Sequence, residues 1–301
     1  MLQTTEKISD AEPSMNQPPQ PLQAVVLGRL VKLLLLCCVV LYVLVCVLMA
    51  VFQRSFIYFP SVFSRQQVEA MAQTAKLERW TNSIGQFIGM KRLSPMQPAD
   101  GTVMITYGNG STAIGCDHYA NDIQGVAAFD IFILEYPGYE DRPGRPSQRS
   151  LFSAADEAFL TLPAKRPVYL VGESLGTGVA SYLAGTYSNR IAGVLLISPF
   201  NSLADAAQSH FPMLPVSLLL SDHFPSEQYL RNFHGKVGIT VDGKDSVVPE
   251  KLGHRLLHGY AGPEKLWAFP DGEHCQITEP PSILWKEVID FWQTDRPTDK
   301  H

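Results

Sequence analysis

The pentapeptide GESLG at positions 172–176 is the segment whose residue types and spacing point most directly to chemistry. It follows a strand-like run at 168–172 and precedes a helix-compatible run at 177–187. A serine flanked two residues away by glycines fits a sharp strand–turn–helix, because glycines lack the Cβ atoms that would clash there and the hydroxyl then projects from the sheet. We interpret Ser174 as a catalytic nucleophile rather than part of an ordinary glycine-rich turn.

A serine hydroxyl is a weak nucleophile at neutral pH and needs a base that a carboxylate holds in place. Of the eight histidines, His274 follows the last predicted strand and is the predicted base. The loop after the preceding strand offers Asp242 and Asp245. Asp245 lies deeper in that turn and is the predicted acid, whereas Asp242 is expected to bond the turn backbone.

The negatively charged intermediate of such a reaction needs two N–H donors. The N–H of Leu175, directly after the nucleophile, is predicted to be one of them. Asn109 is predicted to be the other, from the glycine-rich loop YGNGS at 107–111. The N-x-S sequon there is read as incidental, since a glycan would block the site. Cys116 and Cys275 are expected near the site, although neither occupies a turn suited to a nucleophile.

Short β-like runs alternate with longer helical windows from about residue 75 to 293, which predicts an α/β domain with a mostly parallel sheet. Strands are predicted at 102–107, 130–136, 168–172, 191–198, 237–241 and 265–269, and an edge hairpin at 77–81 and 86–91. Helices are predicted at 147–160, 175–187, 249–259 and 281–293.

Composition narrows the function classes. The 301 residues are 46% hydrophobic and carry a net charge of −5 without a basic run, so the chain can bury a core but lacks the electrostatic footprint of nucleic-acid binding. No C-x-x-C pair suggests a zinc or redox site, and His254 with His258 reads better as a solvated helix face than as a metal pair. No metal and no cofactor are predicted.

Residues 33–52 form an uncharged run that would span about 30 Å as a helix, which matches a bilayer core. The run is too long for a signal peptide and ends in MAVF rather than a small-x-small cleavage site. We predict a single-pass N-terminal anchor. Two basic residues lie on each side of the anchor, Arg29 and Lys32 before it and Arg54 and Arg65 after it. The balance of basic residues therefore does not predict which end of the anchor faces the cytoplasm. Residues 1–32 and 294–301 are predicted to be flexible tails, and 53–293 the globular domain.

With these residues in view, the chain resembles the α/β-hydrolase fold, and within it the membrane-anchored Bem46-like and ABHD-type serine hydrolases. The resemblance covers most of residues 53–293. Its marks are YGNGS at 107–111, EYPGY at 135–139, GRPS at 144–147, GESLG at 172–176, SPF at 198–200, the segment 245–249 and His274. It implies ester or thioester hydrolysis by a Ser-Asp-His triad without a metal, and a cap insertion at about 199–235.

Two departures from the family pattern bear on the site. Tyr107 stands where a histidine is usual, and Val241-Asp242 where His-Gly is frequent, so both are expected to alter the polar lining of the pocket. Arg142 and Pro143 expand the loop after Tyr139, which is expected to be solvent-exposed.

The function predicted from these features is membrane-anchored hydrolysis of acyl esters or thioesters, with lysophospholipid or acylglycerol as first substrate class. The alternatives are an S-acyl protein thioesterase, a serine peptidase and a non-catalytic membrane interaction protein. The expected partners are a lipid or acylated substrate and the bilayer. The apolar stretch 211–220 is interpreted as a helix packed on the sheet, in preference to an acyl-pocket wall or a bilayer contact. Deletion of residues 1–52 is expected to leave the triad assembled.

Overall fold

The computed structural model describes residues 22–294, so the predicted tails at 1–21 and 295–301 lie outside the described residues. The chain divides into two compact units, Met1–Val47 and Leu48–His301. Helix α1 (Leu22–Ile57) runs through this division, and its last turns belong to the second unit. Residues 22–32 are therefore helical rather than part of a flexible tail, and the compact unit begins before Phe52. Within the described chain, one helix, over Val26–Ile57, is long and apolar enough to cross a membrane.

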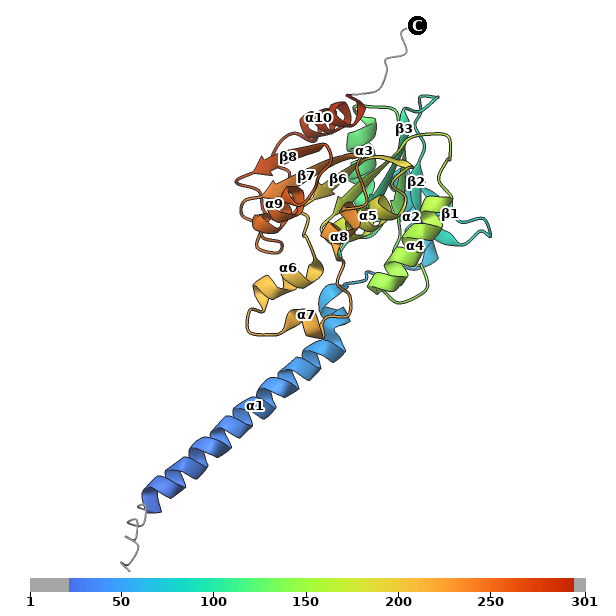
Figure 1. The fold of residues 1–301 in the computed structure, drawn as a ribbon. Helices are drawn as coiled ribbons and strands as arrows, with labels where there is room; N and C mark the ends of the chain where they lie inside the picture. Colours follow the sequence, from blue (N-terminus) through green and yellow to red (C-terminus); the bar gives the residue numbers. More distant parts are fainter. Residues whose placement is uncertain (1–21, 295–301) are drawn as a thin grey trace, which may run out of the picture. The chain divides into compact units, whose positions relative to one another are not determined.

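The second unit is built on an eight-stranded sheet in the order β1-β2-β4-β3-β5-β6-β7-β8 (Figure 1). The strands are β1 (Glu78–Thr81), β2 (Phe87–Arg92), β3 (Gly101–Thr106), β4 (Phe129–Leu134), β5 (Val168–Glu173), β6 (Ile191–Ile197), β7 (Lys236–Asp242) and β8 (Glu264–Phe269). β1 pairs antiparallel with β2 and β2 antiparallel with β4, whereas all later pairs are parallel. The predicted fold class, edge hairpin and six further strands are confirmed.

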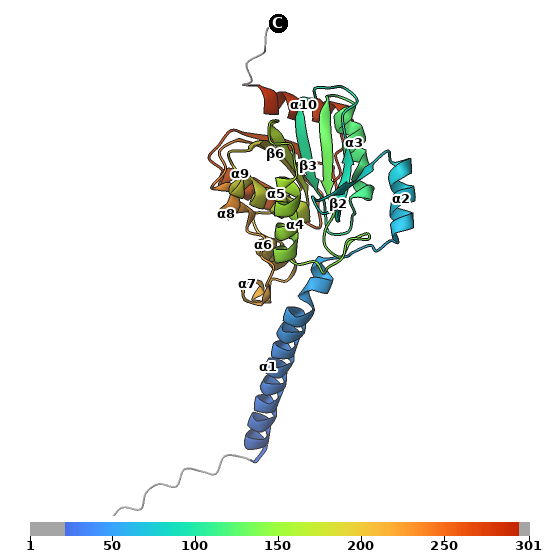
Figure 2. The same cartoon turned by 90° about the vertical axis from the view of Figure 1, so that its right-hand side faces the viewer.

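Helices cover both faces of this sheet, α3 and α10 on one face and α4, α5, α8 and α9 on the other (Figures 1 and 2). The helices outside the cap are α2 (Arg65–Thr74), α3 (Asp117–Gln124), α4 (Gln148–Leu160), α5 (Leu175–Thr186), α9 (Glu250–His258) and α10 (Pro281–Gln293). Helix α10 buries Trp285 and Trp292, and the Trp292 ring stacks on Tyr169 of β5 at 4.6 Å between centroids. The sequence patterns did not predict α2 or α3.

Between β6 and β7 the chain forms α6 (Leu203–His210), α7 (Val216–Leu219) and α8 (Ser226–Leu230). The interpretation of 211–220 as a helix packed on the sheet is wrong: α7 is a single turn, and Met213 and Leu218 are 84% and 83% exposed. Pro212 and Pro215 prevent one continuous helix over 211–220, because proline lacks the backbone donor that a helix interior requires.

The turn between β5 and α5 places Ser174 at φ 48° and ψ −116°, a conformation that non-glycine residues rarely adopt. Neighbouring glycines make room for it. A Cβ on Gly176 would lie 2.2 Å from the carbonyl oxygen of Thr106, and one on Gly172 would lie 2.8 Å from the Cα of Thr177. Both contacts are with backbone, so they cannot be relieved by moving a side chain.

We expect Gly176→Ala to lower the free energy of unfolding by about 1–3 kcal/mol or more, because the added methyl forces backbone apart in a packed core. Gly110→Ala is the matched control, since its Cβ would meet nothing within 4 Å. Urea unfolding of the two variants checks this expectation. Equal stability of the two variants would mean that position 176 tolerates a side chain, and the steric requirement for glycine in this turn would be wrong.

Candidate active site

Ser174, His274 and Asp245 form one continuous chain of hydrogen bonds. The Ser174 Oγ lies 2.9 Å from Nε2 of His274, and Nδ1 of His274 lies 2.7 Å from Oδ2 of Asp245. The residues come from three loops at the carboxyl ends of β5, β7 and β8. The structure thus brings together the three residues that the sequence analysis selected as nucleophile, acid and base.

The carboxylate of Asp245 is held in one orientation. Its Oδ1 accepts hydrogen bonds from the N–H groups of Val247 and Val248, both at 2.7 Å, and its side chain is 1% exposed. Oδ2 is thereby directed at His274. A carboxylate only accepts hydrogen bonds, so this contact fixes the histidine proton on Nδ1 and leaves Nε2 free to accept the proton of Ser174.

Asp242 has a different partner from the one expected. Its Oδ2 accepts a 2.6 Å hydrogen bond from the Ser198 hydroxyl, which in turn accepts the N–H of Cys275 at 3.1 Å. Burial raises the pKa of Asp242, and the negative charge of Asp245 raises it further. Instead of bonding its own turn through its side chain, Asp242 supports the loop that carries His274.

The glycine-rich loop lies directly against the nucleophile. A Cβ on Gly108 would lie 3.4 Å from the Cβ of Ser174, and Asn109 and Leu175 share one cavity with Ser174. The carbonyl of Asn109 accepts hydrogen bonds from the Phe59 N–H at 3.3 Å and the Tyr139 hydroxyl at 2.8 Å. Within residues 22–294, the backbone N–H groups of Asn109 and Leu175 donate to no backbone carbonyl. Their role as donors to a substrate oxygen stays a prediction.

Two buried carboxylates that the sequence analysis missed hold the far end of this loop. Glu135 accepts a hydrogen bond from the Ala113 N–H at 3.0 Å and another from the Tyr107 hydroxyl. Glu140 accepts the N–H of Ile114 at 2.9 Å. Burial raises the pKa of both carboxyl groups, and proximity to Glu140 raises that of Glu135 further. The motif EYPGY at 135–139 carried the signal, but the pattern alone did not indicate what its glutamate bonds.

The family departures thus have structural rather than pocket roles. Tyr107 is fully buried against Glu135 and, like Asp242, lies outside the cavity lining, so the expected change in polar lining is wrong. Arg142 is only 9% exposed and donates to Glu157 at 2.8 Å and to the carbonyl of Ile88 at 3.3 Å, which corrects its expected solvent exposure.

The cavity beside Ser174 is half open to solvent, has a volume of about 230 Å³ and is lined mostly by apolar groups. Its lining comes from the last turns of α1, from α6 and α7, and from the loop after Asp245. It consists of Met49, Gln53, Phe56, Ile57, Asn109, Ser174, Leu175, Phe200, Leu203, Ala206, Ala207, His210, Phe211, Leu214, Val216, Leu219, Leu220, Val247 and Val248. A pocket with this apolar lining binds a hydrocarbon group more favourably than a charged one.

The remaining chemically interesting side chains take no part in the hydrogen-bonded chain from Ser174 to Asp245, although Cys275 lies beside His274, as expected. Burial raises the pKa of both the Cys116 and Cys275 thiols, which keeps them protonated and poorly nucleophilic. His254 and His258 are exposed on α9. Across residues 22–294, no group of three or more His, Cys, Asp or Glu side chains could hold a metal ion.

Comparisons with known proteins match the observed fold and cover the turn that carries Ser174. A family model described as the alpha/beta hydrolase fold matches residues 117–219. The chain is 30% identical over 228 residues to the uncharacterized protein Rv2307c of Mycobacterium tuberculosis, and the match covers 74% of this chain and 80% of that protein. The chain belongs to the α/β-hydrolase family.

Further relatives indicate its type. Lysophosphatidylserine lipase ABHD12 of Mus musculus is 28% identical over 184 residues, which are 54% of this chain and 46% of the lipase, so the chain spans about half of that relative. Alpha/beta hydrolase domain-containing protein 10 from mouse has a TM-score of 0.55 at 15% identity, over 72% of this chain and 98% of that one. The esterase Pf2001 of Pyrococcus furiosus has a TM-score of 0.56 at 14% identity, over 79% and 98%. The chain is an α/β hydrolase that is similar to ABHD-type proteins, and the predicted fold family and enzymatic class are confirmed.

The two aspartates near His274 are expected to separate by function. Asp245→Asn should lower kcat by up to about 10⁴-fold, because an amide can donate to Nδ1 and so favours the wrong histidine tautomer. Asp242→Asn is the matched control and should be mild, since an amide oxygen still accepts from Ser198. Steady-state turnover of a short ester measures both variants. A larger loss for Asp242→Asn would transfer the role of acid to Asp242.

Proposed function

We propose that the chain is a membrane-anchored serine hydrolase that cleaves acyl esters or thioesters, with lysophospholipid or acylglycerol as first substrate class. The observation that carries the proposal is the hydrogen-bonded chain from Ser174 through His274 to Asp245 at the wall of an apolar cavity. Such a chain activates a hydroxyl, and the cavity offers an acyl chain a place next to it.

In the first half of the reaction, Ser174 Oγ attacks the substrate carbonyl while its proton passes to Nε2 of His274. The negative oxygen that forms accepts hydrogen bonds from the N–H groups of Asn109 and Leu175, each worth about 3–4 kcal/mol in related sites. Asp245 stabilises the charged imidazolium. Collapse breaks the bond to the leaving alcohol or thiol, which takes the proton from His274, and leaves an acyl ester on Ser174.

In the second half, water replaces the leaving group. His274 takes a proton from this water as it attacks the acyl ester, and returns the proton to Ser174 Oγ as the carbon–oxygen bond breaks. A fatty acid is released and the free enzyme is restored. Every proton that moves is held by Ser174, His274, water or the leaving group.

Three observations favour a lipid substrate. The cavity is apolar, and burial of each methylene of an acyl chain contributes about 0.8 kcal/mol. Helix α1 has the length and composition of a membrane anchor, which would place the enzyme beside substrates that partition into lipid. A relative with 28% identity is a lysophosphatidylserine lipase. An S-acylated protein presents the same acyl chemistry and is separated from lipids by the experiment below.

A fluorophosphonate probe should label Ser174, because an activated serine attacks phosphorus as it attacks a carbonyl carbon. Ser174→Ala should abolish labelling and lower ester turnover by at least about 10⁴-fold. Ser181→Ala, which removes a buried hydroxyl from α5, is the matched control and should be labelled normally.

Lipid profiling of intact membranes that contain wild type or Ser174→Ala identifies the substrate class. Accumulation of lysophospholipids or acylglycerols with the inactive variant is expected. Accumulation of S-acylated proteins alone would favour the thioesterase alternative, and undiminished labelling of Ser174→Ala would remove Ser174 from the mechanism.

A further inference from the structure

The last turns of α1 form one wall of the cavity that contains Ser174. Met49, Gln53, Phe56 and Ile57 line it, and all four belong to the compact unit that begins at Leu48. Their spacing of i, i+4, i+7 and i+8 places them on a single face of the helix. Val51, on another face of the same turns, is 66% exposed and does not line the cavity.

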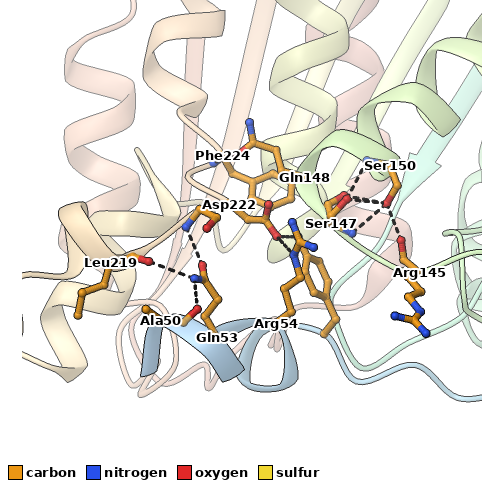
Figure 3. Close-up of polar contacts among 12 residues, drawn as sticks. Ala50, Gln53, Arg54, Arg145, Ser147, Gln148, Ser150, Leu219, Asp222 and Phe224 are labelled. Atoms are coloured by element: carbon orange, nitrogen blue, oxygen red, sulfur yellow. Dashed lines mark hydrogen bonds and ion pairs between the residues drawn. The ribbon is translucent and has the colours of Figure 1, made fainter. Parts of the chain in front are cut away.

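Gln53 fastens this helix face to the loop after α7. Its Nε2 donates to the carbonyl of Leu219 at 3.1 Å and to that of Ala50 at 2.6 Å, and its Oε1 accepts the N–H of Ser221 at 2.6 Å (Figure 3). Both ends of one amide are therefore satisfied. Leu219 and the adjacent Leu220 themselves line the cavity, so the amide joins two parts of the same wall.

The buried carboxylate of Asp222 adds further hydrogen bonds between the end of α1 and the loop after α7. Asp222 is 3% exposed and accepts hydrogen bonds from Nε of Arg54 at 3.2 Å and from the Tyr58 hydroxyl at 3.0 Å (Figure 3). Two residues further on, the N–H of Phe224 donates to the side chain of Gln148 at the start of α4, at 2.8 Å. The loop is thus bonded to the helix end on one side and to the hydrolase core on the other.

The helix end is also bonded to the loop beside the nucleophile. The side-chain amide of Asn109 donates to the carbonyl of Ile57 at 2.8 Å, and the Phe59 N–H donates to the carbonyl of Asn109 at 3.3 Å. Met49, which is partly buried, is consequently held relative to Ser174, whereas Phe56 touches the cavity but is 59% exposed. The side chain of Met49 limits the space in which a group attached to the reacting carbonyl can extend.

We infer that the end of α1 determines the length of acyl chain that the enzyme accepts, with Met49 as a specificity-determining residue and Gln53 as a positioning residue. The inference rests on the proposed function and deepens it. The ligand is the hydrocarbon chain of an acyl ester or thioester. Its methylenes gain free energy by leaving water, and the wall built from α1 limits how many of them can do so.

The test is a chain-length profile of the full-length protein in detergent, measured with p-nitrophenyl acetate, butyrate, octanoate and dodecanoate. Met49→Trp should fill part of the cavity and lower kcat/KM for dodecanoate by about tenfold or more, because excluding even one methylene from an apolar pocket changes kcat/KM by about that factor. The kcat/KM for acetate, which is too short to reach the added ring, should change by less than about threefold. Val51→Trp adds the same ring to an exposed position of the same helix and should leave the profile unchanged.

Gln53→Leu keeps the approximate size of the side chain but removes all three hydrogen bonds. We expect it to raise KM for dodecanoate several-fold while kcat for acetate stays within about threefold, since the joint positions the wall and takes no part in proton transfer. An equal fall in kcat on every ester would instead indicate general damage to the fold and would overturn the positioning role.

A second measurement does not depend on turnover. A fatty acid with a terminal diazirine, photolysed with full-length Ser174→Ala, should crosslink within residues 49–57 or 214–220, as mapped by mass spectrometry. Hydrolysis with an unchanged Met49→Trp profile, or crosslinks confined to other regions, would overturn the inference and leave the proposed function standing. Crosslinks within residues 49–57 or 214–220 without ester turnover by the wild type would support a hydrocarbon site at this wall and overturn the proposed function.

Discussion

The backbone conformation of Ser174 is the constraint on which the rest of the site depends. A φ of 48° is costly for a serine, and such strain persists only where the surroundings over-determine it. Here the Ser174 N–H donates to the carbonyl of Ile197 at 2.9 Å, and the Ser174 carbonyl accepts both the N–H and the hydroxyl of Thr177, at 2.9 and 2.6 Å. The neighbouring strand and the first turn of α5 thus fix the serine from both sides. The hydroxyl of Ser174 reaches His274 because of this turn.

Two sets of hydrogen bonds connect the carboxyl ends of β5, β6, β7 and β8. One runs from Ser174 through His274 to Asp245, and the other from Cys275 through Ser198 to Asp242. The second set contains no group that reaches the nucleophile, yet it holds the residue next to His274. A histidine carried on a loop needs such support, since a general base must stay within hydrogen-bond reach of the proton that it takes. Burial raises the pKa of Asp242, and the neighbouring negative charge of Asp245 raises it further.

The placement of Ser174, Asp245 and His274 followed from the sequence because a parallel sheet brings the carboxyl ends of its strands to one edge. Once the strands were located from their apolar runs, the loops after β5, β7 and β8 had to lie near one another. Helix α3 escaped prediction because it is short and mostly polar: its eight residues, DHYANDIQ, bury only Tyr119, Ala120 and Ile123. The solvent exposure of Arg142 was predicted wrongly for a different reason. The sequence of a loop does not show that its arginine is buried and donates hydrogen bonds to Glu157 and to the carbonyl of Ile88.

The contribution of α1 was hidden by the apolarity of the anchor itself. Periodicity reveals a buried face only where it contrasts with a polar one, and residues 33–52 offer no such contrast, so Met49 looks like any other member of the run. Gln53 was the available sign, because an amide at the end of an apolar helix is costly unless its donors and acceptor are bonded. Its partners, Leu219 and Ser221, lie far away along the chain and become neighbours only in the folded protein. The compact unit that contains the cavity begins at Leu48, and a cut after Phe52 would remove Met49 from the cavity lining.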